Sequence, residues 1–252
     1  MSTPTNDEFY VNYGKIPPSY RRFLVKFIPL LVIGAILFAL IFPRVHDQFN
    51  LGKIQGVKEY EGFLATNPVP HIIVPRPGNT AGEAAFSRYI LSATNKAGPS
   101  PRILEQAGNW VTLSGILVSR NNLSVVAVRS AEPLDPPAGV TVRPDEGVSL
   151  GEFALDGEIV DGKCYPGIMK PGRTKTHRAC AIRCISGGVP AVFRVSNGGD
   201  VMYFLLADLA GEAVNDRVLD LVADDVRITG EVIQYDDMYV IQSDPASYER
   251  LG

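Results

Sequence analysis

The sequence predicts a mainly β protein in which one N-terminal transmembrane helix is followed by two tandem antiparallel β-barrels. Three observations lead to this fold class: a long apolar segment near the N-terminus, an internal repeat of one strand pattern, and short predicted strands that contain a glycine. The expected domains, in chain order, are a cytoplasmic tail (1–22), the helix (23–43), a first β domain (55–131), a proline-rich linker (132–149) and a second β domain (150–247) with an insertion at 163–190.

The apolar segment is long enough to be a transmembrane helix. Residues 27–42 carry no charge, and twelve of these sixteen residues are Leu, Ile, Val or Phe. Extended back past Lys26, the segment reaches the roughly 20 residues that cross a bilayer. Lys26 lies near an end, where its ammonium group can reach the membrane surface. A cleaved signal peptide would end at a small-residue site, whereas Pro43-Arg44 ends this segment. We expect an uncleaved anchor that contacts the bilayer through residues 23–43.

The charges beside the segment predict its direction in the membrane. Four basic residues lie on its N-terminal side and three on the other: Lys15, Arg21, Arg22 and Lys26 against Arg44, Lys53 and Lys58. Cytoplasmic flanks carry the excess of Lys and Arg, so the N-terminus is expected in the cytoplasm. The predicted location is a bacterial inner membrane, crossed once, with the C-terminal domains in the periplasm.

The β region contains two copies of one strand pattern. Residues 111–118 (VTLSGILV) match residues 226–233 (VRITGEVI), 115 positions later. Alternating apolar and polar residues of this kind predict half-buried strands. Asn121-Asn122 and Asp236-Asp237 follow at equivalent positions, and both residue types tolerate the positive φ of a tight hairpin. We therefore expect a hairpin in each copy.

A second offset locates an insertion in the second copy. Residues 61–64 match residues 156–159 at an offset of 95, so the second copy has gained about 20 residues between Cys164 and Val201. Residues 83–95 favour a helix by propensity. The repeat matches part of this segment to a predicted strand, and we therefore predict a strand there.

Short strands that contain a glycine indicate small barrels rather than flat sheets. Over residues 150–242, the succession GEIVD, VFRV, YFLLAD, VRITGEVI and MYVIQ resembles the oligonucleotide/oligosaccharide-binding (OB-fold) domains of bacterial envelope proteins. The resemblance implies two OB-like barrels in tandem. It implies no particular ligand, because this fold hosts many functions.

The cysteine segment is the candidate chemical site, and the sequence leaves its chemistry open. Outside the cytoplasm thiols oxidise, so two of Cys164, Cys180 and Cys184 could form a structural disulfide. A bond from Cys164 to Cys180 would close a loop of about 15 residues and stabilise the fold by about 3 kcal/mol. Alternatively, the three cysteines and His177 form a Cys3His set for zinc. Thiolates with the thioether of Met169 would also suit copper(I).

Two further observations bear on this segment. Nearby cations favour thiolates, so thiol redox chemistry is a third reading. The segment lacks C-x-x-C-H, and covalent haem attachment is therefore not predicted.

Basic residues are concentrated in the same stretch: Lys163, Lys170, Arg173, Lys175, Arg178 and Arg183. The C-terminal part is acidic, so the formal net charge of −3 conceals a polarised surface. Charge of this kind steers docking. The expected partner is an acidic protein face or anionic lipid headgroups. Nucleic acid is not expected, because aromatic residues for base stacking are not concentrated near the basic residues.

The function predicted from these features is non-enzymatic. Catalytic signatures such as G-x-S-x-G, H-E-x-x-H and the phosphate-binding loop do not occur after residue 43, so no catalytic residue is predicted. The main hypothesis is a membrane-anchored periplasmic accessory subunit that binds or stabilises a membrane protein complex, such as an electron-transfer assembly. The alternative is a metal-binding or thiol-redox protein that uses Cys164, His177, Cys180 and Cys184.

Overall fold

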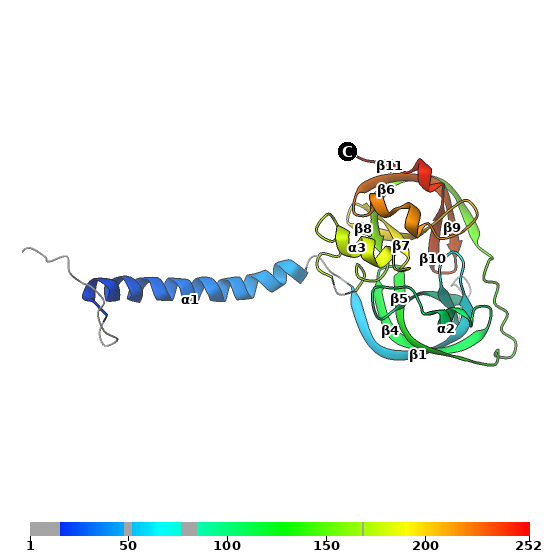
Figure 1. The fold of residues 1–252 in the computed structure, drawn as a ribbon, viewed down its shortest axis with the longest axis horizontal. Helices are drawn as coiled ribbons and strands as arrows, with labels where there is room; N and C mark the ends of the chain where they lie inside the picture. The colour runs from blue at the N-terminus through cyan, green and yellow to red at the C-terminus, as the bar shows by residue number, and fades with distance from the viewer. Residues whose placement is uncertain (1–15, 48–51, 77–84, 168) are drawn as a thin grey trace, which may run out of the picture. The chain divides into compact units, whose positions relative to one another are not determined.

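The computed structural model describes residues 16–47, 52–76, 85–167 and 169–252 (Figure 1). The chain divides into two compact units, Met1–Gln48 and Phe49–Gly252. The first fifteen residues of the predicted cytoplasmic tail lie outside the described residues.

The described part of the first unit forms the helix α1 (Pro18–Asp47). Its segment Tyr20–Val45 is apolar and long enough to span a membrane, and none of it is buried inside protein. The helix begins at Pro18, and proline is well suited to the first turn of a helix because its missing N–H would have no partner there. At each end the helix is a few residues longer than the predicted span of 23–43.

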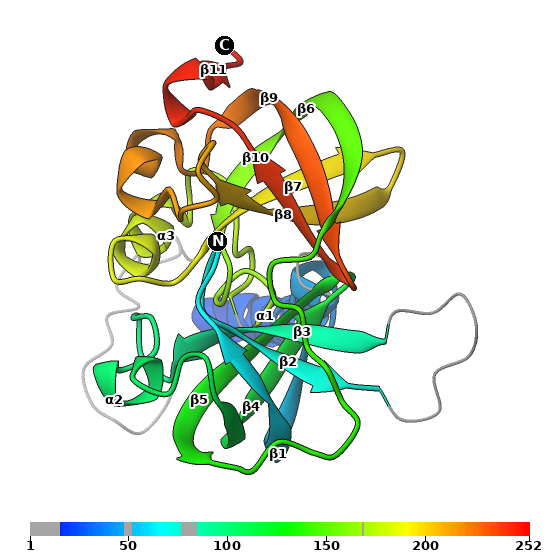
Figure 2. The same cartoon turned by 90° about the vertical axis from the view of Figure 1, so that its right-hand side faces the viewer.

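The first copy of the repeat is a closed five-stranded barrel (Figure 2). Its strands are β1 (Lys53–Ala65), β2 (His71–Pro75), β3 (Phe86–Ala93), β4 (Trp110–Arg120) and β5 (Leu123–Pro133). They follow the order β1-β2-β3-β5-β4, and β4 also pairs with β1. A short helix, α2 (Pro101–Leu104), lies between β3 and β4.

The second copy is a six-stranded sheet. Its strands are β6 (Val148–Asp161), β7 (Ala191–Asn197), β8 (Asp200–Ala207), β9 (Asp225–Tyr235), β10 (Met238–Gln242) and β11 (Glu249–Arg250). The five pairings among β6 to β10 repeat those among β1 to β5 one for one, including the pair that joins the first and fourth strands of each copy. The helix α3 (Arg178–Ile185) lies in the insertion between β6 and β7.

One part of the predicted fold class is wrong, because the strands are not all antiparallel. The third and fifth strands of each copy are parallel: Ile90 pairs with Val125, and Leu205 pairs with Val240. Parallel neighbours need a crossover connection. The fourth strand and its preceding turns supply it in both copies. Apolar alternation is the same for both directions of pairing, so the sequence pattern could not distinguish them.

The predicted repeat is confirmed strand by strand. An offset of 115 carries β4, Trp110–Arg120, onto β9, Asp225–Tyr235. The hairpin residues Asn121 and Asp236 have φ angles of 50° and 52°. The segment that had favoured a helix by propensity forms the strand β3.

Two equivalent glycines explain why the strand pattern contains this residue. A Cβ atom on Gly115 would overlap the side chain of Val126 and crowd the carbonyl oxygen of Ala127 on β5. A Cβ atom on Gly230 would overlap the carbonyl oxygen of Gln242 on β10. The glycine therefore serves the close approach of neighbouring strands.

The two copies pack on each other through reciprocal contacts. Asp237 Oδ1 accepts the backbone N–H of Arg88 at 2.8 Å, and Asn122 Oδ1 accepts the backbone N–H of Tyr203 at 3.0 Å. The offset of 115 relates Asn122 to Asp237 and Arg88 to Tyr203. Each copy thus places its hairpin turn on the third strand of the other.

Apolar side chains between the copies follow the same relation. One buried cluster contains both members of three pairs that are related by the offset: Ile90 and Leu205, Leu123 and Met238, Val125 and Val240. A surface that contacts its own equivalent is the arrangement of a twofold dimer. The repeat therefore forms an internal dimer within one chain, and the insertion of the second copy lies against the first.

Candidate thiol site

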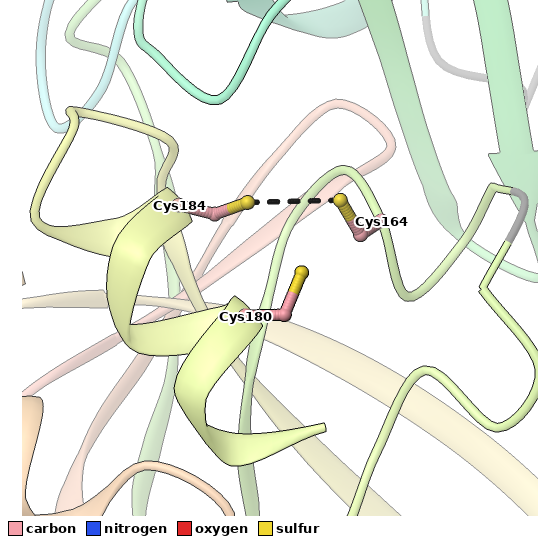
Figure 3. A group of neighbouring side chains, drawn as sticks. All are labelled: Cys164, Cys180 and Cys184. Atoms are coloured by element: carbon pink, nitrogen blue, oxygen red, sulfur yellow. Dashed lines mark hydrogen bonds between the residues drawn. The ribbon is translucent and has the colours of Figure 1, made fainter. Parts of the chain in front are cut away.

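The three cysteines meet in the insertion between β6 and β7. Cys164 follows β6, and Cys180 and Cys184 lie one turn apart on α3, where positions i and i+4 share a helix face. Their sulfur atoms all lie within 4.8 Å of one another. Figure 3 shows the thiols of α3 pointing toward the loop that carries Cys164. Cys184 is buried, and the other two are half-buried.

All three cysteines are free thiols in this structure. Cys164 Sγ and Cys184 Sγ lie 3.6 Å apart, against about 2.05 Å in a disulfide bond. The structural disulfide therefore stays a prediction. Cys164 and Cys184 are the pair in hydrogen-bonding contact, whereas the disulfide considered above joins Cys164 to Cys180.

The environment of Cys164 favours its protonated form. The hydrogen bond to Cys184, then burial, then the negative charge of Asp161 raise the pKa of this thiol. A bound cation would reverse this preference, because metal binding displaces thiol protons.

The structure places His177 differently from the predicted Cys3His set. Its Nε2 atom donates to Asp161 Oδ2 at 3.0 Å, and both side chains are buried. A ring nitrogen of His177 lies within 4.8 Å of a carboxylate oxygen of Asp161 and of Cys164 Sγ, and His177 does not join the cluster of the three cysteines. The site thus consists of two overlapping sets that share Cys164.

Sequence reasoning missed Asp161, which connects these two sets. Its Oδ1 atom accepts the backbone N–H groups of Cys164 at 2.5 Å and Lys163 at 3.2 Å. Its other oxygen holds His177, the residue immediately before α3. Asp161 thereby fixes the Cys164 loop relative to the helix that carries the other thiols. The sequence feature that could have identified Asp161 is its place at a strand end, three residues before Cys164, because Asp commonly accepts hydrogen bonds from nearby backbone N–H groups in turns.

Lys96 is a second missed residue, and it belongs to the first copy. Its Nζ atom donates to Cys180 Sγ at 3.0 Å, and this hydrogen bond raises the pKa of Lys96. No sequence signal could have found it, because it lies 84 positions from Cys180.

Further contacts hold the turn that carries Lys96 against the insertion. The ammonium group of Lys163 donates to the carbonyl oxygens of Ala93 and Asn95. The backbone N–H of Gly98 donates to the carbonyl oxygen of Gly187 at 2.9 Å. The first copy therefore closes one side of the thiol site.

Comparison with known proteins gives no family for this chain. No family model, curated protein or solved structure matches it. The chemistry of its own side chains therefore carries the functional argument.

Three of the six predicted docking residues are paired within the second copy. Lys175 and Arg178 pair with the buried carboxylate of Asp224, Arg178 at 3.1 Å, and Arg173 lies 4.0 Å from Glu158. Lys163 binds the carbonyl groups described above. The side chains of Lys170 and Arg183 are exposed. Two internal carboxylates therefore offset part of the positive charge that the sequence suggested for docking, and one of them, Asp224, also pairs with Arg250. The docking role stays a prediction.

Proposed function

We propose that this protein is a membrane-anchored, non-enzymatic β protein whose three cysteines bind a soft metal ion. One observation carries the proposal: three sulfur atoms from a loop and a helix converge within 4.8 Å of one another. Thiolates are the ligands that copper(I) and zinc(II) select in proteins. When deprotonated, Cys164, Cys180 and Cys184 would hold the ion.

The buried Asp161–His177 pair supports this role from outside the ligand set. It joins the loop of Cys164 to the start of α3, so it fixes the distance between the two segments that supply the thiols. Side chains that hold ligands in place commonly change metal affinity by about 10- to 100-fold when removed. His177 acts here as a positioning residue.

The proposal places α1 across a bacterial inner membrane, with the N-terminus in the cytoplasm and the β copies in the periplasm. The apolar segment Tyr20–Val45 supports a membrane span. The excess of basic residues before it supports the direction. Metal capture in this compartment requires the thiols to be reduced, since oxidised cysteines cannot serve as ligands.

Both β copies are proposed to be OB-like. The support is their shared set of five strand pairings, with one parallel pair in each, since the OB-fold is a five-stranded Greek-key barrel. The insertion in the second copy follows its first strand. This likeness concerns architecture, and the metal proposal does not depend on it.

Metal analysis of the full chain in detergent tests the proposal. The reduced protein is loaded with copper(I) or zinc(II) under exclusion of oxygen, and unbound metal is removed. We expect one equivalent of metal in the wild type and a loss of at least about tenfold in affinity for Cys180→Ser. Ser186→Ala, an exposed change just after the same helix, is the matched control. Wild-type protein without metal, or undiminished binding by Cys180→Ser, would overturn the proposal.

An accessory role in a membrane complex is the second candidate. The favouring observation lies on β6, where residues 148–156 pair with β9 and with no other described strand. Val148, Leu150 and Phe153 are exposed there, and exposed apolar side chains at a sheet edge suit a protein partner. Gentle extraction with identification of co-purifying chains tests this role. Phe153→Arg should remove the companions, whereas Glu152→Arg, which adds the same side chain one position away, should retain them.

A further inference from the structure

The thiol site combines sulfur ligands of the second copy with positive groups from both copies. Its three thiolates would carry three negative charges. The ammonium group of Lys96 is in contact with Cys180. Lys163 is adjacent to Cys164 in the sequence, and its ammonium group binds the carbonyl oxygens of the turn that carries Lys96. Two cations from two different copies thus accompany the three sulfur ligands.

A charge count distinguishes the two metals that the thiols could hold. When the three thiols give up their protons, a monovalent ion leaves the cluster with two negative charges, and a divalent ion leaves it with one. The negative charge of Asp161 beside Cys164 is the same in both cases. The attraction between Lys96 and the loaded site therefore increases with the negative charge of the complex, and it is larger for the monovalent ion.

The ligand count gives the same preference. Among the described residues, no other His, Cys, Asp or Glu joins all three sulfur atoms in one cluster. His177 is engaged with Asp161 instead. Protein zinc sites are almost always four-coordinate, with four protein ligands in structural sites, whereas three soft thiolates suit copper(I).

We propose that the site is built for copper(I), and that Lys96 is a specificity-determining residue that favours this ion over zinc(II). The inference rests on the proposed metal-binding function and deepens it. It also gives the first copy, which has no cysteine, a role: it supplies the charge that adjusts the site. Lys96 acts through Cys180 and does not touch the metal.

The test compares the affinities of the full chain for copper(I) and zinc(II), each in competition with a chelator of known affinity under reducing conditions. Lys96 is exposed, so replacing Lys96→Met should weaken copper(I) binding roughly fivefold and zinc(II) binding roughly twofold, magnitudes expected of one solvent-screened charge. Lys96→Arg retains the charge and should keep the wild-type ratio. Lys58→Met, an exposed change on β1, is the matched control.

The change in the ratio decides the question, because thiolate sites generally bind copper(I) tightly whatever surrounds them. Equal losses for both metals in Lys96→Met, or no loss for either, would overturn the role of Lys96 while metal binding stands. Wild-type protein that binds neither metal would overturn metal binding and this inference together. If Lys96→Met does not fold, Lys96→Gln provides the same neutral change with a polar side chain.

Discussion

At the scale of single residues, the thiol site depends on one carboxylate, Asp161, that lies outside the proposed set of metal ligands. Asp161 receives two backbone N–H groups and the ring of His177, and it is fully buried. Buried charges persist only when they are hydrogen-bonded or paired. Asp161 satisfies this condition by binding both segments that carry the cysteines.

A second buried residue, His71, makes the stability of the fold depend on pH. Its Nδ1 atom donates to the carbonyl oxygen of Val69 at 2.8 Å, and its Nε2 atom faces Arg88 Nη1 at 3.1 Å. Burial lowers the pKa of His71 to about 4. The neutral ring is therefore the folded form, whereas the unfolded chain takes up a proton near pH 6.5.

This difference predicts a loss of stability in acid. The stabilising contribution of neutral His71 is fully present above pH 6.5 and is lost as the pH falls toward 4. Between pH 7 and pH 4.5 the loss attributable to this residue is about 2 kcal/mol. Denaturant unfolding of the full chain at both pH values should show that difference in the wild type and a smaller one in His71→Gln. Equal pH dependence in both proteins would contradict the prediction.

At the scale of elements, the repeat explains which strand positions tolerate change. Gly115 on β4 and Gly230 on β9 lie against backbone carbonyl groups of the neighbouring strand. The backbone of a sheet cannot move aside as a flexible side chain can. A methyl group at either position would therefore separate a pair of strands.

We accordingly expect Gly115→Ala to lower the free energy of unfolding by about 1 to 3 kcal/mol, the usual cost of overpacking. Gly56→Ala is the matched control, because a Cβ atom there meets nothing within 4 Å. Thermal or chemical unfolding of both variants measures the difference. A Gly115→Ala protein as stable as Gly56→Ala would show that β4 and β5 can separate at little cost.

At the scale of the whole molecule, the two copies share one buried cluster and reciprocal hydrogen bonds. The Arg88 side chain is 2% exposed and pairs with Asp236 at 2.9 Å, so a charged group of the first copy depends on the second. Breaking such a buried pair usually destabilises a protein by about 3 to 5 kcal/mol. The copies should therefore unfold together.

The single tryptophan makes this expectation measurable. Trp110 lies on β4, in the first copy, and its fluorescence reports the unfolding of that copy. The substitution Gly230→Ala in the second copy should shift the Trp110 transition to lower denaturant by the same amount as a probe of total secondary structure. If the Trp110 transition stays in place while the other probe shifts, the copies unfold independently.

The sequence by itself determined the apolar helix, the two copies, the hairpin turns and the segment that holds the thiols. These features depend on local properties: an uninterrupted apolar run, period-two alternation, residues that accept positive φ, and similarity at a fixed offset. Each can be recognised by reading along the chain, without knowledge of what lies beside these residues in space.

Only the tertiary structure decided which groups complete the site. The parallel strand pairs, the Asp161–His177 contact and the hydrogen bond from Lys96 to Cys180 all depend on how distant segments pack. The physical reason is that the spacing of residues along a chain specifies the type of each element, whereas its neighbours are chosen by burial of apolar surface between elements. The first copy contributes to the thiol site because the two copies pack as an internal dimer.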